Sequence, residues 1–532
     1  MPEIIFSPSN KKANLEQGRT VLSYIQELGI NISASCGGRG ICRGCLVKID
    51  QKENLNDLTK IEIEFIKDQA YRLACQAKIV REIEDIFVAI PEFRKYKILT
   101  KGKTKKISLN PFVTKKRSII SSKVFSENNE IDKYKGEIYG LALDIGTTTI
   151  SMSWIDLETG QERFISSSLN PQMSYGDNVI DRINYAKTKD QNHLRQALVD
   201  RINEMIIQGP VKSDHIYEIV AVGNTVMRDI IVNNSITKLG EAPFEPISKE
   251  SVRKWAEQIG IIIHPKAKVY SLPIIGHFVG ADALAVILST EMYKNQEITM
   301  AIDIGTNTEI AIGNREKIIV TSCASGPAFE GSGIKCGTGA IEGAISQIEI
   351  KDDLSIEYET IDDASPSGIC GSGLIDVLAE MLDRNIIDKK GKFLKGENKF
   401  TIKENGKPIF IDGEDIDNLK LAKAAIHVGT KAVMRHYGVE LKNVERLYLA
   451  GAFGNYVDPL KAIEIGMLPD ISLKKVERVG NAAIEGARQA LIAKEKRKDA
   501  EVIPKKTKHI RLEMEKNFQD QFVNGLLFDK YE

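Results

Sequence analysis

Two stretches of the chain share one pattern of apolar and polar positions. A largely apolar run, residues 139–143, leads into Asp144-Ile-Gly-Thr-Thr-Thr149, and a second run, residues 298–302, leads into Asp303-Ile-Gly-Thr-Asn-Thr308. After each motif, apolar and polar residues alternate, which is typical of a half-buried strand. Each stretch therefore predicts a strand, a tight turn at the glycine and a second strand.

The rest of the chain after about residue 138 alternates apolar runs with longer amphipathic segments. The longest predicted helix covers residues 416–437, and a closing helix is expected over 511–528. This alternation is typical of α/β architecture. We divide the region into two halves, 138–293 and 294–532, each beginning with one copy of the motif. The repetition predicts a duplicated fold that grips one nucleotide between its halves.

The composition of the two turns favours phosphate and metal binding. Glycine lets the backbone approach a ligand closely, and successive N–H groups and threonine hydroxyls can hold phosphate oxygens. An aspartate at the end of a strand suits Mg²⁺, which keeps several waters and takes one or two carboxylates. A single Asp-x-Gly-Thr turn also occurs in plain hairpins, so the prediction rests on the two copies. The predicted ligand-binding residues are Gly146, Thr147, Thr148, Gly305, Thr306 and Asn307, with Asp144 and Asp303 as catalytic carboxylates.

Residues 1–92 form a separate unit with an unusual cysteine distribution. Four of the seven cysteines of the chain lie here, at Cys36, Cys42, Cys45 and Cys75. Four thiolates can hold a [2Fe–2S] cluster, and the glycines between the first three let the loop wrap it. The alternative is a structural zinc site, but such sites usually bring their ligands in two close pairs. We predict the cluster.

Residues 93–137 are predicted to be a basic flexible linker. From Arg94 to Lys123 there are eleven Lys or Arg residues and no Asp or Glu, and apolar periodicity is poor. A flexible tether would let the first domain move between an electron donor and an acceptor. The positive charge could also steer an acidic redox partner.

Overall composition narrows the classes of function. The 532 residues predict several domains, and 73 basic residues balance 73 acidic ones. This balance argues against a general nucleic-acid binder or a polybasic membrane binder. The start of the chain lacks the pattern of a signal peptide, so we expect a cytoplasmic protein without a membrane partner.

The motifs resemble those of two known groups. Residues 3–91 are similar to an α+β ferredoxin domain of β-grasp fold, of the adrenodoxin-like branch. The duplicated turns resemble the phosphate motifs of the superfamily of acetate and sugar kinases, heat-shock chaperones and actin, which implies an α/β, ribonuclease H-like ATPase unit. The resemblance implies an adenosine motif at Gly451, Ala452, Phe453 and Gly454. It also implies a catalytic base at Asp282, whose alternative role is a helix N-cap. Glu330 is a weaker candidate.

The combination of the two units resembles the reductive activators of corrinoid proteins. Asn170-Pro-Gln, Gly223-Asn-Thr and Ser325-Gly-Pro-Ala-Phe-Glu-Gly are similar to motifs of that family. The resemblance implies ATP- and Mg²⁺-dependent reduction of Co(II) to Co(I) in a corrinoid protein of a methyltransferase system. A low-potential electron donor would then be needed, and we also consider a homodimer. The alternatives are a small-molecule kinase or a chaperone-like nucleotide switch with an appended redox sensor, and an activator of a radical dehydratase.

Overall fold

The N-terminal domain is a five-stranded mixed sheet with one helix packed on it. The computed structural model describes residues 2–30, 32, 34, 38, 40, 44–66, 68, 70–90, 102–117, 122–176, 178–404, 406, 408–454 and 456–531. The strand order is β2-β1-β5-β3-β4, with β1 parallel to β5 and the other pairs antiparallel. This arrangement confirms the predicted β-grasp fold. The elements are β1 (Glu3–Ser7), β2 (Lys11–Asn14), α1 (Val21–Glu27), β3 (Leu46–Ile49), α2 (Lys60–Phe65), β4 (Tyr71–Leu73) and β5 (Ile86–Ala89).

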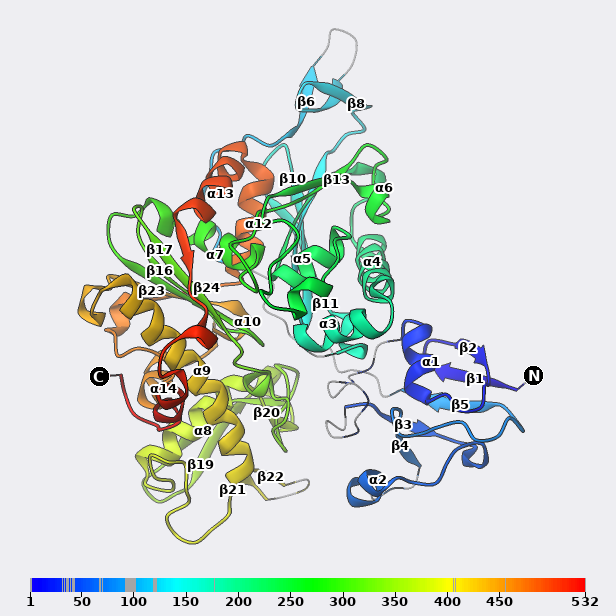
Figure 1. Cartoon of the computed structure of the whole chain (residues 1–532), viewed down its shortest axis with the longest axis vertical. Coiled ribbons are helices and arrows are strands. Elements are labelled where there is room, and N and C mark those ends of the chain that lie inside the picture. The colour runs from blue at the N-terminus through cyan, green and yellow to red at the C-terminus, as the bar shows by residue number, and fades with distance from the viewer. Residues whose placement is uncertain are drawn as a thin grey trace.

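The sequence pattern explains why these segments fold as they do. In β1 the buried Ile4 and Phe6 alternate with more exposed neighbours, so one face of the strand lies on the core. Helix α1 begins after Thr20, whose side chain accepts a hydrogen bond from the backbone N–H of Ser23. Figure 1 shows this domain, in blue, beside a larger unit of two lobes.

The segment predicted to be a flexible linker is partly folded. It contains an antiparallel sheet of β6 (Val113–Arg117), β7 (Ser122–Ser126) and β8 (Asn129–Lys133), which projects from the top of the molecule in Figure 1. Upstream, Gly102 and Asn110 form bridges with Gly480 and Ala493 of the last part of the chain. The prediction of a flexible tether is therefore wrong for residues 102–117 and 122–137. Residues 91–101 and 118–121 lie outside the described residues.

The larger unit contains two sheets with the same five-stranded core. One sheet has the order β11-β10-β9-β12-β14 and the other β17-β16-β15-β23-β24, so each has its first strand in the centre. A sixth strand extends each sheet, β13 beside β14 and β25 beside β17. The duplication predicted from the repeated motif is confirmed. The strands are β9 (Tyr139–Ile145), β10 (Thr149–Asp156), β11 (Glu162–Leu169), β12 (Ile216–Gly223), β13 (Val252–Trp255), β14 (Lys268–Ser271), β15 (Thr299–Asp303), β16 (Thr308–Gly313), β17 (Ile318–Cys323), β23 (Arg446–Ala450), β24 (Val476–Gly480) and β25 (Thr507–His509).

Two helices join the lobes. Helix α7 (Ala281–Thr290) comes from the first half of the chain and α12 (Ala482–Ile492) from the end of the second. They approach so closely that a Cβ on Gly486 would lie 2.3 Å from the carbonyl oxygen of Ala285. Helix α12 also packs on β9 and β12, so an element of the second half completes the core of the first lobe. The division at residue 293 therefore separates the two sheets but not the two hydrophobic cores.

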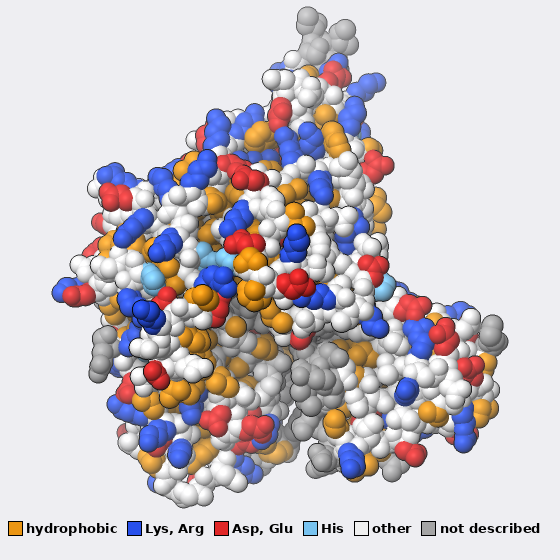
Figure 2. Space-filling model, viewed as in Figure 1, with side chains coloured by type: hydrophobic (Ala, Val, Ile, Leu, Met, Phe, Trp, Pro, Cys, Tyr) orange, Lys and Arg blue, Asp and Glu red, His pale blue; other side chains and the backbone are white. Residues whose placement is uncertain are grey.

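Lobe two carries further helices around its sheet. The long helix α9 (Gly413–Tyr437) is present as predicted, and Asp412 caps its N-terminus. The expected closing helix over 511–528 is shorter, with α14 (Phe518–Gly525) as its only α-helical part, and it packs on α9. Among the described residues, no helix is both long and apolar enough to cross a membrane. Figure 2 shows Lys and Arg side chains interspersed with Asp and Glu over the visible face.

Candidate functional site

The two predicted phosphate turns meet between the lobes. The first turn joins β9 to β10 and the second joins β15 to β16. The hydroxyl oxygens of Thr148 and Thr306 lie 3.0 Å apart. Both hydroxyls donate to the carboxylate of Glu330, Thr148 to Oε2 at 3.1 Å and Thr306 to Oε1 at 2.8 Å. The structure thus brings together two motifs that the sequence predicted separately, and adds Glu330 between them.

The first turn is held by residues from three other elements. Asn170 donates from Nδ2 to the carbonyl oxygen of Gly146 at 2.8 Å, and its backbone N–H donates to the carbonyl oxygen of Thr148. Asn224 donates to the hydroxyl of Thr147 at 3.0 Å, and Arg182 donates to the carbonyl oxygen of Thr147 at 2.5 Å. The Asn170-Pro-Gln and Gly223-Asn-Thr motifs therefore position the phosphate turn. Arg182 was not predicted, because it belongs to none of the motifs in the sequence.

The second turn is held in a similar way by the Ser325-Gly-Pro motif. The hydroxyl of Ser325 lies 3.1 Å from the carbonyl oxygen of Gly305, and the N–H of Gly326 donates to the carbonyl oxygen of Thr306 at 2.9 Å. Ser325 also contacts the hydroxyl of Thr308 at 2.8 Å. These hydrogen bonds to the carbonyl oxygens of the turn fix its conformation. Asn307, the remaining predicted phosphate-binding residue, lies within this turn.

The predicted adenosine motif lies directly beside the second turn. Gly451–Gly454 forms the short helix α10, immediately after β23. Gly451 has φ of +85°, and a Cβ there would lie 2.5 Å from the carbonyl oxygen of Ile304 and 2.8 Å from Oδ1 of Asp303. Only glycine allows this approach. The backbone of Ala452 and Phe453 belongs to the same helix, so the predicted motif adjoins the second turn.

Four carboxylates surround the junction of the turns, and burial is the main influence on each. Burial raises the pKa of Asp144 to about 6, although Asn481 donates to its Oδ2 at 2.8 Å. Burial and the negative charge of Asp144 raise the pKa of Asp303 to about 7. Burial also raises the pKa of Asp282 and Glu309, and the nearby aspartates raise both further. A cation is the group that would relieve this accumulation of negative charge.

The arrangement of these acids limits how they could bind a metal ion. Among the residues that the structure describes, no three His, Cys, Asp or Glu side chains are placed to hold one directly. Glu309 was not predicted from the sequence, although it directly follows the second motif. The hydroxyl of Ser322 donates to it at 3.0 Å.

Asp282 lies at the start of α7, as predicted. The N-cap of the helix is Gly280, so Asp282 is not the capping residue and its carboxylate accepts from the N–H of Ala283 at 2.7 Å. Gly280 allows a close approach, because a Cβ there would lie 2.4 Å from the Cα of Asn224. The start of α7 therefore packs against Asn224, which follows β12 and bonds the first turn. The alternative role as an N-cap is wrong, and the carboxylate lies close enough to Asp144 and Asp303 for their charges to raise its pKa.

The predicted cluster ligands are described in part. Cys45 and Cys75 are buried in the N-terminal domain, whereas Cys36 and Cys42 lie outside the described residues. A hydrogen bond with Cys45 is the main cause that lowers the pKa of the Cys75 thiol to about 7. Gln76 donates to the same sulfur at 3.4 Å. A thiol poised for deprotonation and placed beside a second thiol fits a ligand set for an iron–sulfur cluster.

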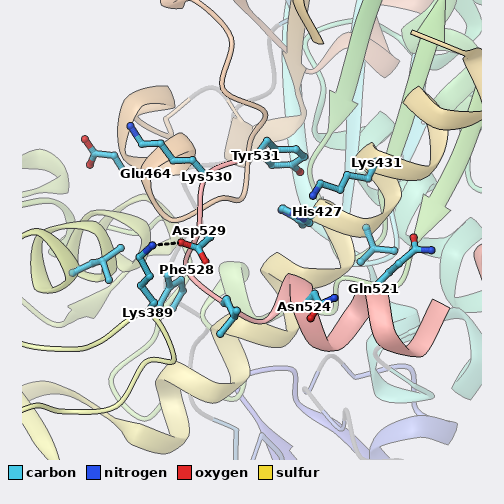
Figure 3. A pocket seen from close by; sticks show the side chains of 13 residues that line it. Lys389, His427, Lys431, Glu464, Gln521, Asn524, Phe528, Asp529, Lys530 and Tyr531 are labelled. Carbon is cyan, nitrogen blue, oxygen red and sulfur yellow. Dashed lines mark ion pairs between the residues drawn. The ribbon is translucent and has the colours of Figure 1, made fainter. Parts of the chain in front are cut away.

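A cavity of about 780 Å³ lies elsewhere in lobe two. Figure 3 shows its lining, which includes Lys431 of α9, Gln521 and Asn524 of α14, and the ion pair of Lys389 with Asp529 at 2.5 Å. None of the predicted site residues lines this cavity, so the cavity is distinct from the predicted nucleotide site.

The fold and the site define a class: a ferredoxin domain joined to an actin-like unit with paired phosphate turns. Sequence models agree with this class along most of the chain. The model "2Fe-2S iron-sulfur cluster binding domain" matches residues 4–80, "RACo middle region" matches 139–295, and "C-terminal domain of RACo the ASKHA domain" matches 297–532. The chain belongs to the RACo family, the reductive activators of corrinoid proteins.

Individual relatives match most or all of the chain. The corrinoid activation enzyme RamQ of Eubacterium limosum is 29% identical, with 99% of each chain covered. The [Co(II) methylated amine-specific corrinoid protein] reductase of Methanosarcina barkeri is 27% identical over 74% of this chain and 77% of its own. A solved structure titled reductive activator for corrinoid, iron-sulfur protein superposes with a TM-score of 0.73 at 28% identity, covering 100% of this chain and 99% of its own.

Proposed function

We propose that this protein uses ATP to drive the one-electron reduction of Co(II) to Co(I) in a partner corrinoid protein. The observation that carries the proposal is the meeting of Thr148 and Thr306, 3.0 Å apart, in a chain that also carries a ferredoxin domain. Two phosphate turns from opposite lobes form one site, which is what a nucleotide-driven change between the lobes requires. The names of the relatives support the corrinoid substrate.

The chain's own residues would take the following roles. The thiolates of Cys36, Cys42, Cys45 and Cys75 would hold a [2Fe–2S] cluster, which when bound supplies one electron at a time. Asp144 and Asp303 would orient Mg²⁺ through its waters. Asp282 would take the proton of the water that attacks the γ-phosphate, giving ADP and phosphate. The nucleotide would be held by Gly146, Thr147, Thr148, Gly305, Thr306 and Asn307 at its phosphates, and by Gly451, Ala452, Phe453 and Gly454 at its adenosine.

ATP can assist only by binding one conformation of the protein better than another. Because each lobe supplies one phosphate turn, a nucleotide that contacts both turns favours the closed arrangement of the lobes. We propose that the closed form grips the corrinoid protein and that hydrolysis releases it. A low-potential electron donor would restore the reduced state after each turnover. We further propose that the protein is cytoplasmic and that it assembles into a homodimer.

The test uses the holoprotein, a chemical reductant and a Co(II) corrinoid protein, with the cobalt absorption spectrum as readout. We expect Co(I) to accumulate with Mg²⁺ and ATP, and not with ADP or without nucleotide. If Co(I) forms equally well without ATP, the proposed coupling is wrong. If a small molecule is phosphorylated instead, the kinase alternative replaces it.

A further inference from the structure

The ferredoxin domain touches lobe one through the end of α1. Gln26 donates from Nε2 to the carbonyl oxygen of Ser174 at 2.5 Å, and the hydroxyl of Tyr175 donates to the carbonyl oxygen of Gln26 at 2.8 Å. Burial raises the pKa of Tyr175, so the hydroxyl keeps the proton that it donates. Figure 1 shows α1 beside α3 (Val179–Thr188), the helix that follows this segment.

The segment that receives the ferredoxin domain also holds the first phosphate turn. Asn170 bonds the carbonyl oxygens of Gly146 and Thr148. Arg182 bonds the turn at the carbonyl oxygen of Thr147, and the segment at the carbonyl oxygen of Gly176 at 2.9 Å. Residues 170–176 therefore contact the phosphate turn at one end and Gln26 at the other.

Hydrogen bonds hold the segment in one conformation. Its residues 171–174 form a 3-10 helix, capped by the side chain of Asn170, which accepts from the N–H of Gln172 at 3.0 Å. Gln172 is fully buried, donates to the carbonyl oxygen of Leu194 at 2.9 Å and accepts from Arg182 at 3.1 Å. One of these bonds lies within the segment, and the others tie it to Leu194 and to Arg182, which also bonds the phosphate turn.

On the other side of the contact, α1 is bonded to the segment that carries a cluster ligand. The N–H of Leu22 donates to the carbonyl oxygen of Ala74 at 2.8 Å, and the N–H of Val21 donates to that of Ala77 at 2.9 Å. These two acceptors flank Cys75. The contact at Gln26 is thus made by a helix that is bonded to both sides of Cys75.

We propose that residues 170–176 relay the nucleotide state of the first phosphate turn to the position of the ferredoxin domain. The relay rests on the proposed function, because it requires a nucleotide at the turn. Among the residues that the structure describes, two hydrogen bonds hold the domain to this segment, which is a weak hold. A ligand with different affinity for the docked and the released domain therefore shifts their populations. The coupling is reciprocal, so weakening the contact also changes the affinity for the nucleotide.

The experiment compares Tyr175→Phe and Gln26→Ala with Tyr185→Phe in the full-length holoprotein. Tyr185 is a matched control, because it packs on Tyr175 but its hydroxyl contacts His193 instead of Gln26. Hydrogen exchange is measured by mass spectrometry for peptides covering Val21–Glu27, with and without a non-hydrolysable ATP analogue. Calorimetry measures the affinity for the analogue, and the visible absorption of the cluster verifies folding of the domain.

We expect the analogue to change exchange in this helix at least severalfold in the wild type and in Tyr185→Phe. In Tyr175→Phe and Gln26→Ala the exchange should be the same with and without the analogue, and the affinity should differ from that of the wild type. The relay is wrong if the bound analogue leaves wild-type exchange unchanged, or if Tyr175→Phe responds like the wild type. Formation of Co(I) without ATP would refute the proposed function but leave these exchange results unaffected, so the two failures are distinguishable.

Discussion

Thr148 and Thr306 belong to different lobes, yet their hydroxyl oxygens lie 3.0 Å apart. Both donate to Glu330, which follows β17 of the second lobe along the chain. Burial raises the pKa of Glu330, although these hydrogen bonds lower it. The three side chains form a direct contact between the halves of the predicted nucleotide site. We expect a substitution of any of them to lower the rate of ATP hydrolysis more than the stability of the fold.

The first prediction concerns the hydroxyl of Thr306. Thr306→Val keeps the shape of the side chain but removes the group that contacts both Thr148 and Glu330. We expect ATP hydrolysis to fall by at least about tenfold, because a positioned hydroxyl donor stabilises charge that develops in the transition state. Phosphate release measures the rate. Thr188→Val, at the exposed end of α3, should hydrolyse ATP like the wild type, and equal loss in both variants would contradict the assignment.

The second prediction concerns the carboxylate of Asp282. Asp282→Asn removes the proposed base, and we expect hydrolysis to fall by about 100-fold or more. The same variant should be more stable than the wild type at pH 8, by about 1 kcal/mol, because it removes a buried charge that nearby acids disfavour. Urea unfolding measures the difference. Asp200→Asn, on the exposed face of α4 (Gln191–Gln208), should change neither quantity.

The sign of the pH dependence follows from raised pKa values. An acid whose folded pKa exceeds its unfolded value stabilises the fold fully below the unfolded pKa, near 4, and loses this contribution as pH rises through the folded pKa. For Asp144 and Asp303 the loss spans the range from about pH 4 to about 6 and 7. The pKa of Asp282 is raised in the same way, so the stability that Asp282→Asn gains over the wild type should shrink toward pH 4. Mg²⁺ with ADP should raise the melting temperature more at pH 8 than at pH 5.

The third prediction separates the two units. Cys75→Ser removes a predicted cluster ligand in the N-terminal domain, so we expect loss of the visible absorption of the cluster and of Co(I) formation. ATP hydrolysis should persist, because the turns belong to other domains. Cys336→Ser is the matched control, since its sulfur is half-buried in lobe two. A full cluster spectrum in Cys75→Ser would show that the ligand is misassigned.

The fourth prediction uses two glycines with the same backbone conformation. Gly451 and Gly438 have φ of +85° and +84°, but a Cβ on Gly438 meets nothing within 4 Å, whereas one on Gly451 would meet Ile304 and Asp303. Replacement of either by alanine costs about 1 kcal/mol of conformational strain. Gly451→Ala should cost about 1–3 kcal/mol more by overpacking, and should abolish ATP binding. Calorimetric titration with ATP distinguishes the two variants, and equal affinities would remove the adenosine motif from the site.

The linker shows where the sequence was misleading. Its lysines indicated a solvated tether, but Lys115 pairs with Glu158 and lies over the ring of Tyr134. Each strand of the small sheet buries few apolar side chains, among them Val113, Val124 and Ile131. Such sparse apolar positions give too weak a periodicity to predict strands. Partners supplied by distant acids stabilise the sheet, and they are not visible in the local pattern.

The sequence by itself determined the repeated turns, the four cysteines and the α/β alternation. These are local properties, because a turn or a strand depends on residues that are neighbours in the chain. Only the tertiary structure decided that Asn481 holds Asp144, 337 positions away, and that Gln26 meets Tyr175, 149 positions away. It also decided that α12 completes the core of the first lobe. Such pairings depend on the packing of whole surfaces, which no local pattern of one sequence encodes.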